Sequence, residues 1–492
     1  MLSRLSTVAA VAQLAITAAA SPCKVATINS TVAAWLAQYP DATVKDTDVV
    51  IVGGGSSGSN AAINLVDAGQ SIILIEKEAQ LGGMVNSYTD PSTGVVYDYG
   101  VATFTNLTGT EAYFARLGIE TKSPTFGATT PYYADFTTGE TIDYVAPSIT
   151  DEFAALGTYY DVAAQYSDLF LPSYANWPAP EDIPEDLLMP FGDFAVKYNL
   201  NDTMLLLWAG IGAGLADMLS LPALYVMQTF GPQTAAVFLG TDVQYVPASG
   251  RNQDIYDAVA NILGDAVLLN SMVSQSLRLA NDQGVALLVE DQVTGDYTIV
   301  TAKRLVMAIE PTASNLAPFA ADSTESAVFN KGTWSVVNTG LVSHPSLPTD
   351  ALIYNLPASA ANGNDFAYPE PPFVDYFEYV GGGLFQAIVV GWELSVDDAQ
   401  TLAQDALEKL AEAGTIPATN GVPLTIESWS SHGPMDMRVT KEDLQAGFIQ
   451  ELYALQGYRS TYWTGAAFSN QLSTYLWAYN LEYLVPLVVA SL

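Results

Sequence analysis

The stretch from Asp48 to Glu76 constrains this chain most, because it joins an apolar run, a glycine-rich turn, an amphipathic segment and a second apolar run. That order predicts a strand, a turn, a helix and a strand. The glycines are spaced as Gly53-x-Gly55-x-x-Gly58. The first allows a tight turn, the second lets the backbone approach a pyrophosphate, and the third lets the helix and the strand pack closely. The stretch therefore predicts a Rossmann-like dinucleotide-binding unit.

The predicted helix starts directly after the glycines, so its free N–H groups, around Ser57, can face phosphate oxygens. Glu76 ends the second strand, 21 residues after Gly55. A carboxylate there can accept hydrogen bonds from both hydroxyls of an adenosine ribose, and it repels a 2′-phosphate. This acid favours FAD or NAD over NADP.

A second pair of glycines favours FAD. Gly82 and Gly83 follow Leu81, just past the second strand, and Met84 comes next. A further turn without Cβ atoms can approach the same pyrophosphate, and an NAD domain has no need of it. We therefore expect Gly82, Gly83 and Met84 to lie at an FAD site.

Composition sets the broad class of protein. The chain has 492 residues, half of them apolar, which is enough for two or three domains with a large core. Its 52 acidic residues against 16 basic ones give a formal net charge of −36. Long-range repulsion then disfavours nucleic acid, and we expect neutral or cationic partners.

The N-terminal segment is typical of a secretory signal peptide. Residues 1–20 carry one arginine, a short apolar run and small residues before Ser21. The apolar run is too short to span a bilayer. Asn29, Asn106 and Asn201 each begin an N-glycosylation motif, which has meaning only in the secretory pathway. We expect a secreted or secretory-lumen glycoprotein.

Cys23 is the single cysteine and His344 and His432 are the only histidines. No intramolecular disulfide can form, and neither a cysteine-rich nor a multi-histidine metal site is possible. We expect no metal in the site.

The residues from Val25 to Val44 predict a short helical entry segment that ends near Pro40. The run from Val95 to Gly100 predicts a short strand ending at a glycine. Asp98 within it has two possible roles, a residue near the cofactor or an ordinary turn residue.

The region from Met204 to Leu239 is almost uncharged, with Asp217 alone. Glycines, Pro222 and Pro232 interrupt it, which favours a buried helical lobe with an apolar ligand pocket over a membrane span. The glycines at 210, 212 and 214 are expected to pack helices rather than bind a nucleotide.

Hydrophobic periodicity predicts further elements downstream. They are a helix at Asp254–Leu263, a strand at Ala266–Asn270, three short strands within Ala286–Ile309, a β-rich stretch at Phe373–Glu393, a helix at Asp397–Glu412, and a strand followed by a long apolar helix within Tyr462–Leu492. This layout predicts an α/β fold, a Rossmann-like FAD-binding domain of several chain segments with an inserted α+β substrate domain. The FAD-binding segments are 46–110, 245–315 and 435–492, and the substrate segments are 111–244 and 316–434.

The sequence resembles the flavin-containing amine oxidase superfamily and, within it, the fungal secreted flavoproteins of the beta-cyclopiazonate dehydrogenase family. Four blocks carry the resemblance and span nearly the whole mature chain. They are the first glycine motif with Glu76, then Leu81-Gly82-Gly83, then Val267–Val273 with Met307–Pro311, and finally Tyr462-Trp463-Thr464-Gly465-Ala466 preceded by Leu455-Gln456-Gly457.

The resemblance implies an FAD cofactor, with the backbone of Val273 near the adenine and Gly465 and Ala466 beside the pyrophosphate and the flavin ring. The thioether cysteine of covalent amine oxidases is absent from the C-terminal block, so we expect noncovalent FAD. Many amine oxidases have an arginine where this chain has Met84. That departure weakens a simple amine-oxidase interpretation more than it weakens FAD binding.

Flavin oxidation needs few acid-base residues, because the protein mainly excludes water, positions the substrate and handles one proton. His432 is the catalytic candidate, since histidine titrates near neutrality, although a hydrogen-bonded loop histidine explains it equally simply. Arg438 and Arg459 are rival electrostatic groups. Tyr462 and Trp463 could face the flavin or belong to the core.

The leading hypothesis is an FAD-dependent oxidase or dehydrogenase that removes a hydride from a small, apolar, polycyclic secondary metabolite. Molecular oxygen or another acceptor would then reoxidise the flavin. The alternatives are a flavin amine oxidase for small amines, an FAD monooxygenase and a non-catalytic flavin-binding protein.

Overall fold

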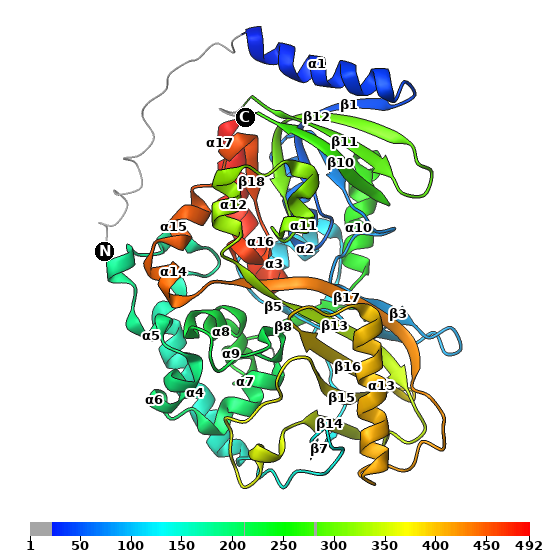
Figure 1. The fold of residues 1–492 in the computed structure, drawn as a ribbon, viewed down its shortest axis with the longest axis vertical. Coiled ribbons are helices and arrows are strands. Elements are labelled where there is room, and N and C mark those ends of the chain that lie inside the picture. The colour runs from blue at the N-terminus through cyan, green and yellow to red at the C-terminus, as the bar shows by residue number, and fades with distance from the viewer. Residues whose placement is uncertain (1–21, 211, 280–282) are drawn as a thin grey trace.

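The computed structural model describes residues 22–210, 212–279 and 283–492. It has two halves, each built around a β-sheet, with β17 (Thr425–Arg438) running along the boundary between them (Figure 1). The predicted signal peptide and its cleavage site lie outside the described residues. This architecture confirms the predicted α/β fold.

The first sheet has seven strands taken from three separated parts of the sequence. Its order is β10-β11-β12-β1-β2-β9, and β18 pairs with the C-terminal part of β12. The strands are β1 (Thr43–Val52), β2 (Ile72–Ile75), β9 (Val267–Leu268), β10 (Ser271–Arg278), β11 (Val285–Asp291), β12 (Tyr297–Met307) and β18 (Thr461–Trp463).

The centre of this sheet is parallel, and β1 pairs with both β2 and β12 in that sense. Val49, Val50 and Ile51 are fully buried, which explains why the sequence there is continuously apolar rather than alternating. The parallel strands β1, β2, β12 and β18 bring their C-terminal ends to one edge of the sheet. In open α/β sheets this edge is where ligands bind.

Helices cover both faces of the first sheet. Residues Pro22–Gln38 form α1, as expected, and its Trp35 packs against Leu288 and Ile299 on the outer layer of β11 and β12. The other helices of this half are α2 (Ser56–Asp67), α3 (Thr110–Leu117), α10 (Asp254–Leu263), α11 (Ala313–Leu316), α12 (Ser323–Phe329), α14 (Lys441–Gln445), α15 (Phe448–Tyr453), α16 (Ser473–Tyr479) and α17 (Val485–Ser491).

Two predictions about this half need correction. The region Ala286–Ile309 holds two long strands, β11 and β12, rather than three short ones, because they pair as an antiparallel hairpin around Thr294-Gly295. The strand predicted at Ala266–Asn270 is shorter and covers Val267–Leu268. The predicted long C-terminal helix is confirmed, with a π-helical turn at Asn480–Leu484 between α16 and α17. Helix α10 also spans the residues predicted for it.

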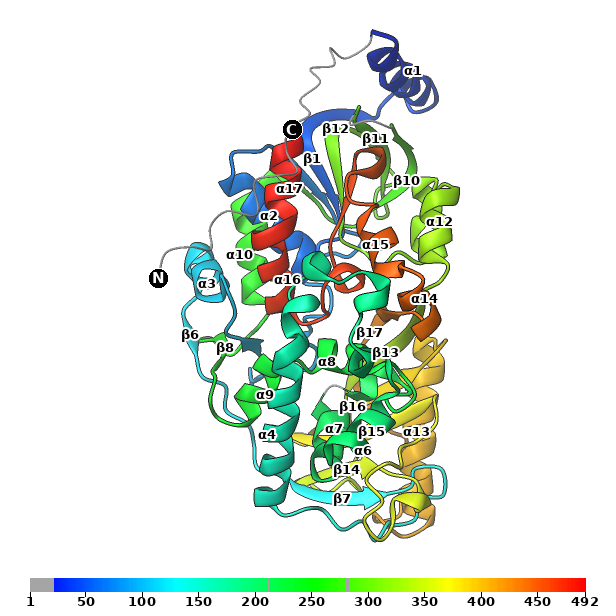
Figure 2. The same cartoon turned by 90° about the vertical axis from the view of Figure 1, so that its left-hand side faces the viewer.

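The second sheet has six strands in the order β17-β13-β16-β15-β14-β7. Its strands besides β17 are β7 (Thr130–Ala134), β13 (Thr333–Ser343), β14 (Ala351–Asn355), β15 (Phe373–Gly381) and β16 (Leu384–Gly391). The predicted helix near Asp397 is α13 (Val396–Glu412), which buries Ala403, Leu407 and Leu410 against one face. A helical lobe covers the other side of the sheet (Figure 2).

The uncharged region forms part of this lobe, as predicted, but as short helices. They are α7 (Met204–Gly210), α8 (Ala223–Thr229) and α9 (Pro232–Phe238), beside α4 (Ile149–Tyr166), α5 (Glu185–Leu188) and α6 (Phe191–Tyr198). A Cβ at Gly212 would lie 2.7 Å from the Leu207 carbonyl oxygen, so this glycine does serve close packing. Within the described ranges, no helix is both long and apolar enough to cross a membrane.

Small sheets join the halves. One is the hairpin of β3 (Ser87–Thr89) and β4 (Val96–Asp98), and the other comprises β5 (Phe104–Thr105), β6 (Thr121–Lys122) and β8 (Gln244–Pro247). The chain therefore passes between the halves several times. The domain boundaries given above stay a prediction, and the one at residues 434 and 435 falls within β17.

Candidate active site

The first glycine motif forms the turn between β1 and α2. Gly53 has φ of 101°, and a Cβ there would lie 2.5 Å from the Ala308 carbonyl oxygen. A Cβ at Gly58 would overlap the Gly53 carbonyl oxygen. Gly55 is the N-cap of α2 and leaves the helix without a side-chain cap. The open helix N-terminus is suited to bind phosphate.

The hydroxyl of Ser57 is engaged within the protein. Its Oγ lies 2.5 Å from Oγ1 of Thr464, and Thr464 donates to Oδ1 of Asn480 over 2.7 Å. The Asn480 side-chain amide donates a hydrogen bond to the Ser57 carbonyl oxygen over 2.9 Å. These bonds fix the C-terminal segment to the start of α2. Ser57 therefore has its backbone, rather than its hydroxyl, to offer a cofactor.

Glu76 lies at the end of β2 and is 7% exposed. Its Oε2 accepts from the Gly54 N–H over 2.6 Å, and its Oε1 accepts from the Glu78 N–H over 2.9 Å. Each carboxylate oxygen keeps a further lone pair. The acid is thus held rigidly beside the glycine turn and can still accept two ribose hydroxyls.

The second glycine pair packs directly on the first. Gly82 forms a parallel bridge with Gly55, and its N–H donates to the Gly54 carbonyl oxygen over 3.0 Å. A Cβ at Gly83 would lie 2.9 Å from the Gly55 Cα. A side chain at Gly83 would therefore separate the two turns, whereas a Cβ at Gly82 would lie 2.9 Å from Oε1 of Gln253. Met84 is half-buried and packs against the main core.

Two polar residues that sequence reasoning missed hold this turn. The Gln253 amide donates to the Leu81 carbonyl oxygen over 2.7 Å, and its Oε1 is buried without a partner. Asn252 donates to the Val101 carbonyl oxygen over 2.7 Å. Both residues directly precede α10, and no local motif marks them in the sequence.

Asp98 is a strand residue rather than an ordinary turn residue, and its predicted place near the cofactor stays a prediction. It lies in β4 and accepts hydrogen bonds from the Ser87 hydroxyl and from the Asn252 N–H, the latter at 3.1 and 3.2 Å. Burial raises its pKa, although these hydrogen bonds oppose the shift. Asp98 joins the β3–β4 hairpin to the residues that hold the second glycine pair.

Val273 lies in β10 at a β-bulge, and its side chain is 6% exposed. The nearby Ser271 N–H donates to the Glu76 carbonyl oxygen over 2.9 Å. The strand therefore runs beside the end of β2 that carries the ribose acid. The position suits a backbone contact to the adenine, and that contact stays a prediction.

Gly465 and Ala466 follow β18 at the same edge of the sheet. Gly465 has φ of 111°, and a Cβ there would meet nothing within 4 Å, so space opens in front of it. Glu310 lies beside them: it accepts from the Trp334 indole N–H over 3.2 Å and from the Ala466 backbone. Burial raises the pKa of Glu310 to about 7. Glu310 belongs to the block Met307–Pro311 that carries the family resemblance, but sequence reasoning gave it no role.

His432 is in strand β17 rather than in a loop. It occupies a β-bulge opposite Val337 and Asn338 and is followed by Gly433 with φ of 67°. Its Nε2 lies 3.0 Å from Oδ1 of Asn86, three residues after Gly83. Burial lowers its pKa to about 4, so the ring is neutral at pH 7. Its catalytic role stays a prediction.

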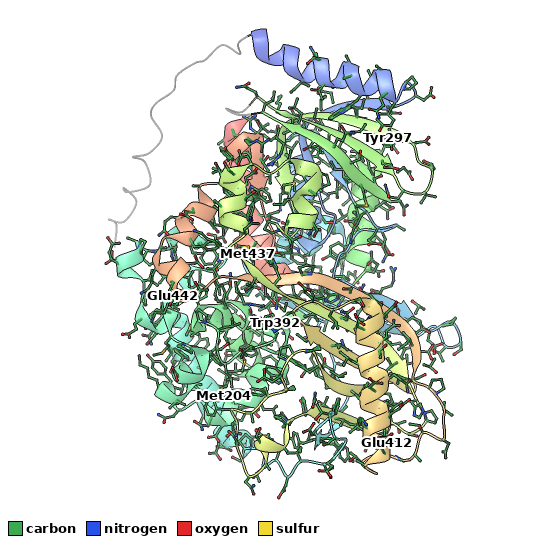
Figure 3. The ribbon with its side chains drawn as sticks, viewed as in Figure 1. Met204, Tyr297, Trp392, Glu412, Met437 and Glu442 are labelled. Carbon is green, nitrogen blue, oxygen red and sulfur yellow. The ribbon has the colours of Figure 1, made fainter. Side chains whose placement is uncertain are left out.

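The rival groups separate in space. Arg459 binds the Ala320 carbonyl oxygen and Glu325, on the side of α12. Tyr462 and Trp463 are buried in β18, and the Trp463 ring stacks on the Phe468 ring with their centroids 5.9 Å apart. Arg438 is the last residue of β17 and follows Met437 in sequence; Figure 3 labels Met437 between the two halves. Of these four, Arg438 alone lies in the same strand as His432.

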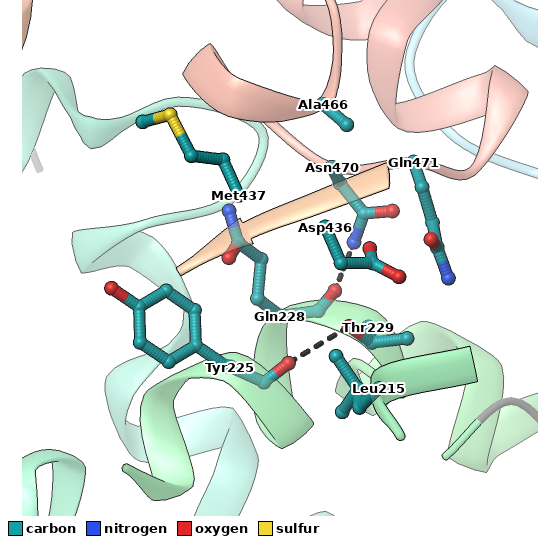
Figure 4. Close-up of a pocket in the computed structure, with 9 residues that line it drawn as sticks. All are labelled: Leu215, Tyr225, Gln228, Thr229, Asp436, Met437, Ala466, Asn470 and Gln471. Carbon is teal, nitrogen blue, oxygen red and sulfur yellow. Dashed lines mark hydrogen bonds between the residues drawn. The ribbon is translucent and has the colours of Figure 1, made fainter. Parts of the chain in front are cut away.

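A cavity lies where β17, the helical lobe and the C-terminal segment meet (Figure 4). It has about 240 Å³ of empty space, part of which is open to solvent. The lobe contributes Leu215, Tyr225, Gln228 and Thr229, β17 contributes Asp436 and Met437, and the C-terminal segment contributes Ala466, Asn470 and Gln471. The lining is more polar than the uncharged lobe sequence predicts, because distant segments add amides and an acid.

One sheet edge thus brings together an open helix N-terminus, a ribose acid, a second glycine turn and a strand-to-glycine turn that borders a cavity. These features fit the class of dinucleotide-dependent oxidoreductases, and a cofactor path from Glu76 towards Ala466 stays a prediction. Among the residues that the structure describes, no group of histidine, cysteine and acidic side chains could hold a metal ion.

Comparisons with known proteins agree with this class. A family model described as an NAD(P)-binding Rossmann-like domain matches residues 51–117. The FAD-dependent oxidoreductase oblC of Cochliobolus heterostrophus is 33% identical, over 90% of this chain and 92% of that protein. Beta-cyclopiazonate dehydrogenase of Aspergillus oryzae is 32% identical, over 92% and 96%. The chain belongs to this family of FAD-dependent oxidoreductases, and FAD is its cofactor.

Solved structures show the same fold. A CLA-producing fatty acid isomerase from P. acnes superposes with a TM-score of 0.67 at 18% identity, covering 90% of this chain and 98% of that one. Putrescine oxidase bound to putrescine gives a TM-score of 0.59 at 16% identity, covering 91% and 100%. At these identities the likeness concerns the fold, which confirms the resemblance to amine oxidases at that level.

Proposed function

We propose that this FAD-dependent oxidoreductase removes a hydride from an apolar, polycyclic secondary metabolite in a natural-product pathway, a step that can trigger ring closure. One observation carries the proposal: the likeness to a beta-cyclopiazonate dehydrogenase runs through nearly the whole chain, including the lobe and sheet that border the cavity. Similarity restricted to the cofactor half would have supported FAD binding alone.

The residues present fit FAD. The turn around Gly53, Gly55 and Gly58 would hold the pyrophosphate on the N-terminus of α2, and Glu76 would accept the ribose hydroxyls. The backbone of Val273 would face the adenine, and Gly465 and Ala466 would face the flavin. The missing side chains at Gly55 and Gly83 let the two turns pack on each other, and the open space in front of Gly465 is available to a cofactor. Cys23 is far in sequence from the flavin block, which supports noncovalent attachment.

Bound FAD supplies a two-electron acceptor that takes a hydride from carbon. The protein's part is to hold the substrate carbon near the flavin, exclude water and handle one proton. The cavity beside Ala466 is bordered by the lobe, β17 and the C-terminal segment, and these elements limit the access of water to it. The neutral His432 and its partner Asn86 border the second glycine turn and can orient it.

A screen for the substrate tests the proposal. Purified holoenzyme and oxygen are incubated with fungal metabolite extracts, and mass spectrometry searches for compounds that lose two hydrogens. A hit should also bleach the flavin anaerobically without NADPH. Flavin reduction by NADPH alone would point to a monooxygenase and contradict the proposal.

We also propose that the protein enters the secretory pathway and is N-glycosylated. Asn29 and Asn201 are exposed and Asn106 is half-buried, which supports access by the glycosylation machinery. N-terminal sequencing of protein from a fungal host should begin at Ser21, and glycosidase treatment should lower its mass. A native N-terminus at Met1 with no mass change would contradict this proposal.

A further inference from the structure

Strand β17 changes register where it reaches the cavity. Thr333 pairs with Arg438 and Ser335 pairs with Met435, so Asp436 and Met437 together face one residue of β13. Asp436 also has φ of 55°, in the left-handed region that few non-glycine residues adopt. Bulges of this kind re-aim side chains and are common beside active sites. Here the bulge directs Asp436 into the cavity.

The Asp436 carboxyl is 8% exposed and lies among amides (Figure 4). When the Gln471 amide is oriented with its nitrogen towards Asp436, the nitrogen donates hydrogen bonds to both carboxylate oxygens. The distance from this nitrogen to Oδ2 is 2.6 Å. Turned over, the same amide would offer its oxygen to a protonated carboxyl. Gln471 can therefore satisfy Asp436 in either protonation state.

The charged and titratable groups around Asp436 come from several elements. Burial raises the pKa of Asp436 to about 7, and the Arg438 guanidinium opposes the rise. The Glu310 carboxyl, at the end of β12, is disfavoured as an anion by burial and by Asp436. Tyr225 of α8 and Asp217 act on Arg438, which itself donates to the Ser335 hydroxyl over 3.2 Å. A proton acceptor is most effective when it titrates near the working pH.

We propose that Asp436 accepts the proton of an N–H or O–H group on or beside the substrate carbon that is oxidised. This inference rests on the proposed function. In the step, the N–H or O–H bond breaks and its proton passes to the carboxylate, while the electron pair of the C–H bond leaves as hydride to the FAD oxidant. A C=N or C=O double bond forms. The substrate is thus a polycyclic compound with a polar hydrogen at the reacting position.

Anaerobic flavin reduction by three related probes tests the assignment. Tetrahydroisoquinoline has an N–H beside its benzylic carbon, tetralol has an O–H on it, and tetralin has neither. Wild-type holoenzyme should be reduced by a probe that carries the polar hydrogen and not by tetralin. The rate should rise as the pH passes about 7, because the carboxylate then forms.

Asp436→Asn should lower the reduction rate about 100-fold or more and remove its rise with pH, while FAD content stays unchanged. The matched control is Asp375→Asn. Asp375 is another buried acid at a β-bulge, in β15, where the Trp208 indole donates to it over 3.2 Å. It does not line the cavity, so this variant should keep the wild-type rate.

A measurement without substrate complements the kinetics. Infrared pH titration of holoenzyme with isotope-labelled aspartate should show a carboxylic acid band that disappears as the pH rises through about 7. Burial raises the pKa of Asp375 to about 8, so Asp375 should contribute a second band that disappears at higher pH. The band that disappears near pH 7 should be missing in Asp436→Asn and present in Asp375→Asn, and the second band should show the reverse. A wild type without the band that disappears near pH 7 would overturn the inference even if the variant failed to fold.

The remaining outcomes separate the two proposals. A wild-type flavin that no donor reduces, neither a probe nor a metabolite from the screen, would remove the proposed function and this inference with it. A wild-type flavin that is reduced by a donor at the same rate as in Asp436→Asn would overturn this inference alone.

Discussion

The cofactor edge of the first sheet and the cavity under β17 are built in different ways. At the cofactor edge, short local motifs place backbone atoms, and the glycines at 53, 58 and 83 are needed because a Cβ would meet neighbouring backbone. In the cavity, side chains from residues 215 to 471 converge. The cofactor edge is specified by the spacing of residues within one stretch of sequence, whereas the cavity depends on how distant elements pack. Mutations should therefore act differently on the two.

The largest effect on FAD binding is expected from Gly58→Ala. The added methyl group would overlap the Gly53 carbonyl oxygen and force α2 away from β1. Overpacking costs about 1–3 kcal/mol or more, and here it would also displace the pyrophosphate turn, so we expect purified protein without FAD. Absorbance at the flavin bands measures retention.

Gly157→Ala is the matched control. This glycine lies within α4, and a Cβ there would meet nothing within 4 Å. The variant should retain FAD and gain about 0.5–1 kcal/mol in free energy of unfolding. If Gly58→Ala retained FAD equally well, the close approach at this turn would not be essential.

Next comes Glu76→Gln, which keeps the side-chain shape and removes the charge. Hydrogen bonds to a charged group contribute about 1.5–3 kcal/mol, so FAD affinity should fall roughly tenfold to a hundredfold. Fluorescence titration of apoprotein with FAD measures it. Glu78→Gln, at an exposed neighbour, should leave the affinity unchanged, and an equal loss in both variants would argue against a ribose contact.

Gln253→Leu should have a smaller effect on FAD affinity. It removes the 2.7 Å hydrogen bond to the Leu81 carbonyl oxygen, but the glycine pair remains packed on Gly55. A lost hydrogen bond of about 1 kcal/mol predicts a several-fold weaker binding of FAD, measured by the same titration. Unchanged affinity would show that glycine packing alone sets the turn.

His432→Gln tests the region of the cavity, at a residue of β17 that does not itself line it. The folded pKa of His432, about 4, lies below its ordinary value of 6.5. Its contribution to stability is thus present above about pH 6.5 and is lost as the pH falls towards 4. Urea unfolding should show that the wild type loses about 1–2 kcal/mol more than the variant between pH 7 and pH 4.5. Equal slopes would mean that His432 is not buried as a neutral ring.

How well each site could be predicted from the sequence also differs between the cofactor edge and the cavity. The motif at Gly53, the acid at Glu76 and the pair at Gly82 could be found from sequence because each acts through spacing within one unit. Gln253, Glu310 and Asp436 could not, since nothing local distinguishes a buried amide or acid from an exposed one. His432 was found by its rarity, but its place in a β-bulge depends on pairing with β13, which is remote in sequence.

The sequence by itself determined the strand, turn and helix that bind a dinucleotide, the preference for FAD and the presence of an uncharged helical lobe, because periodicity and glycine spacing express local backbone requirements. Only the tertiary structure decided which polar groups face the cavity. Register shifts in β17 aim Asp436 inward, and burial among segments hundreds of residues apart raises its pKa. Those effects arise from packing, which no single stretch of the chain contains.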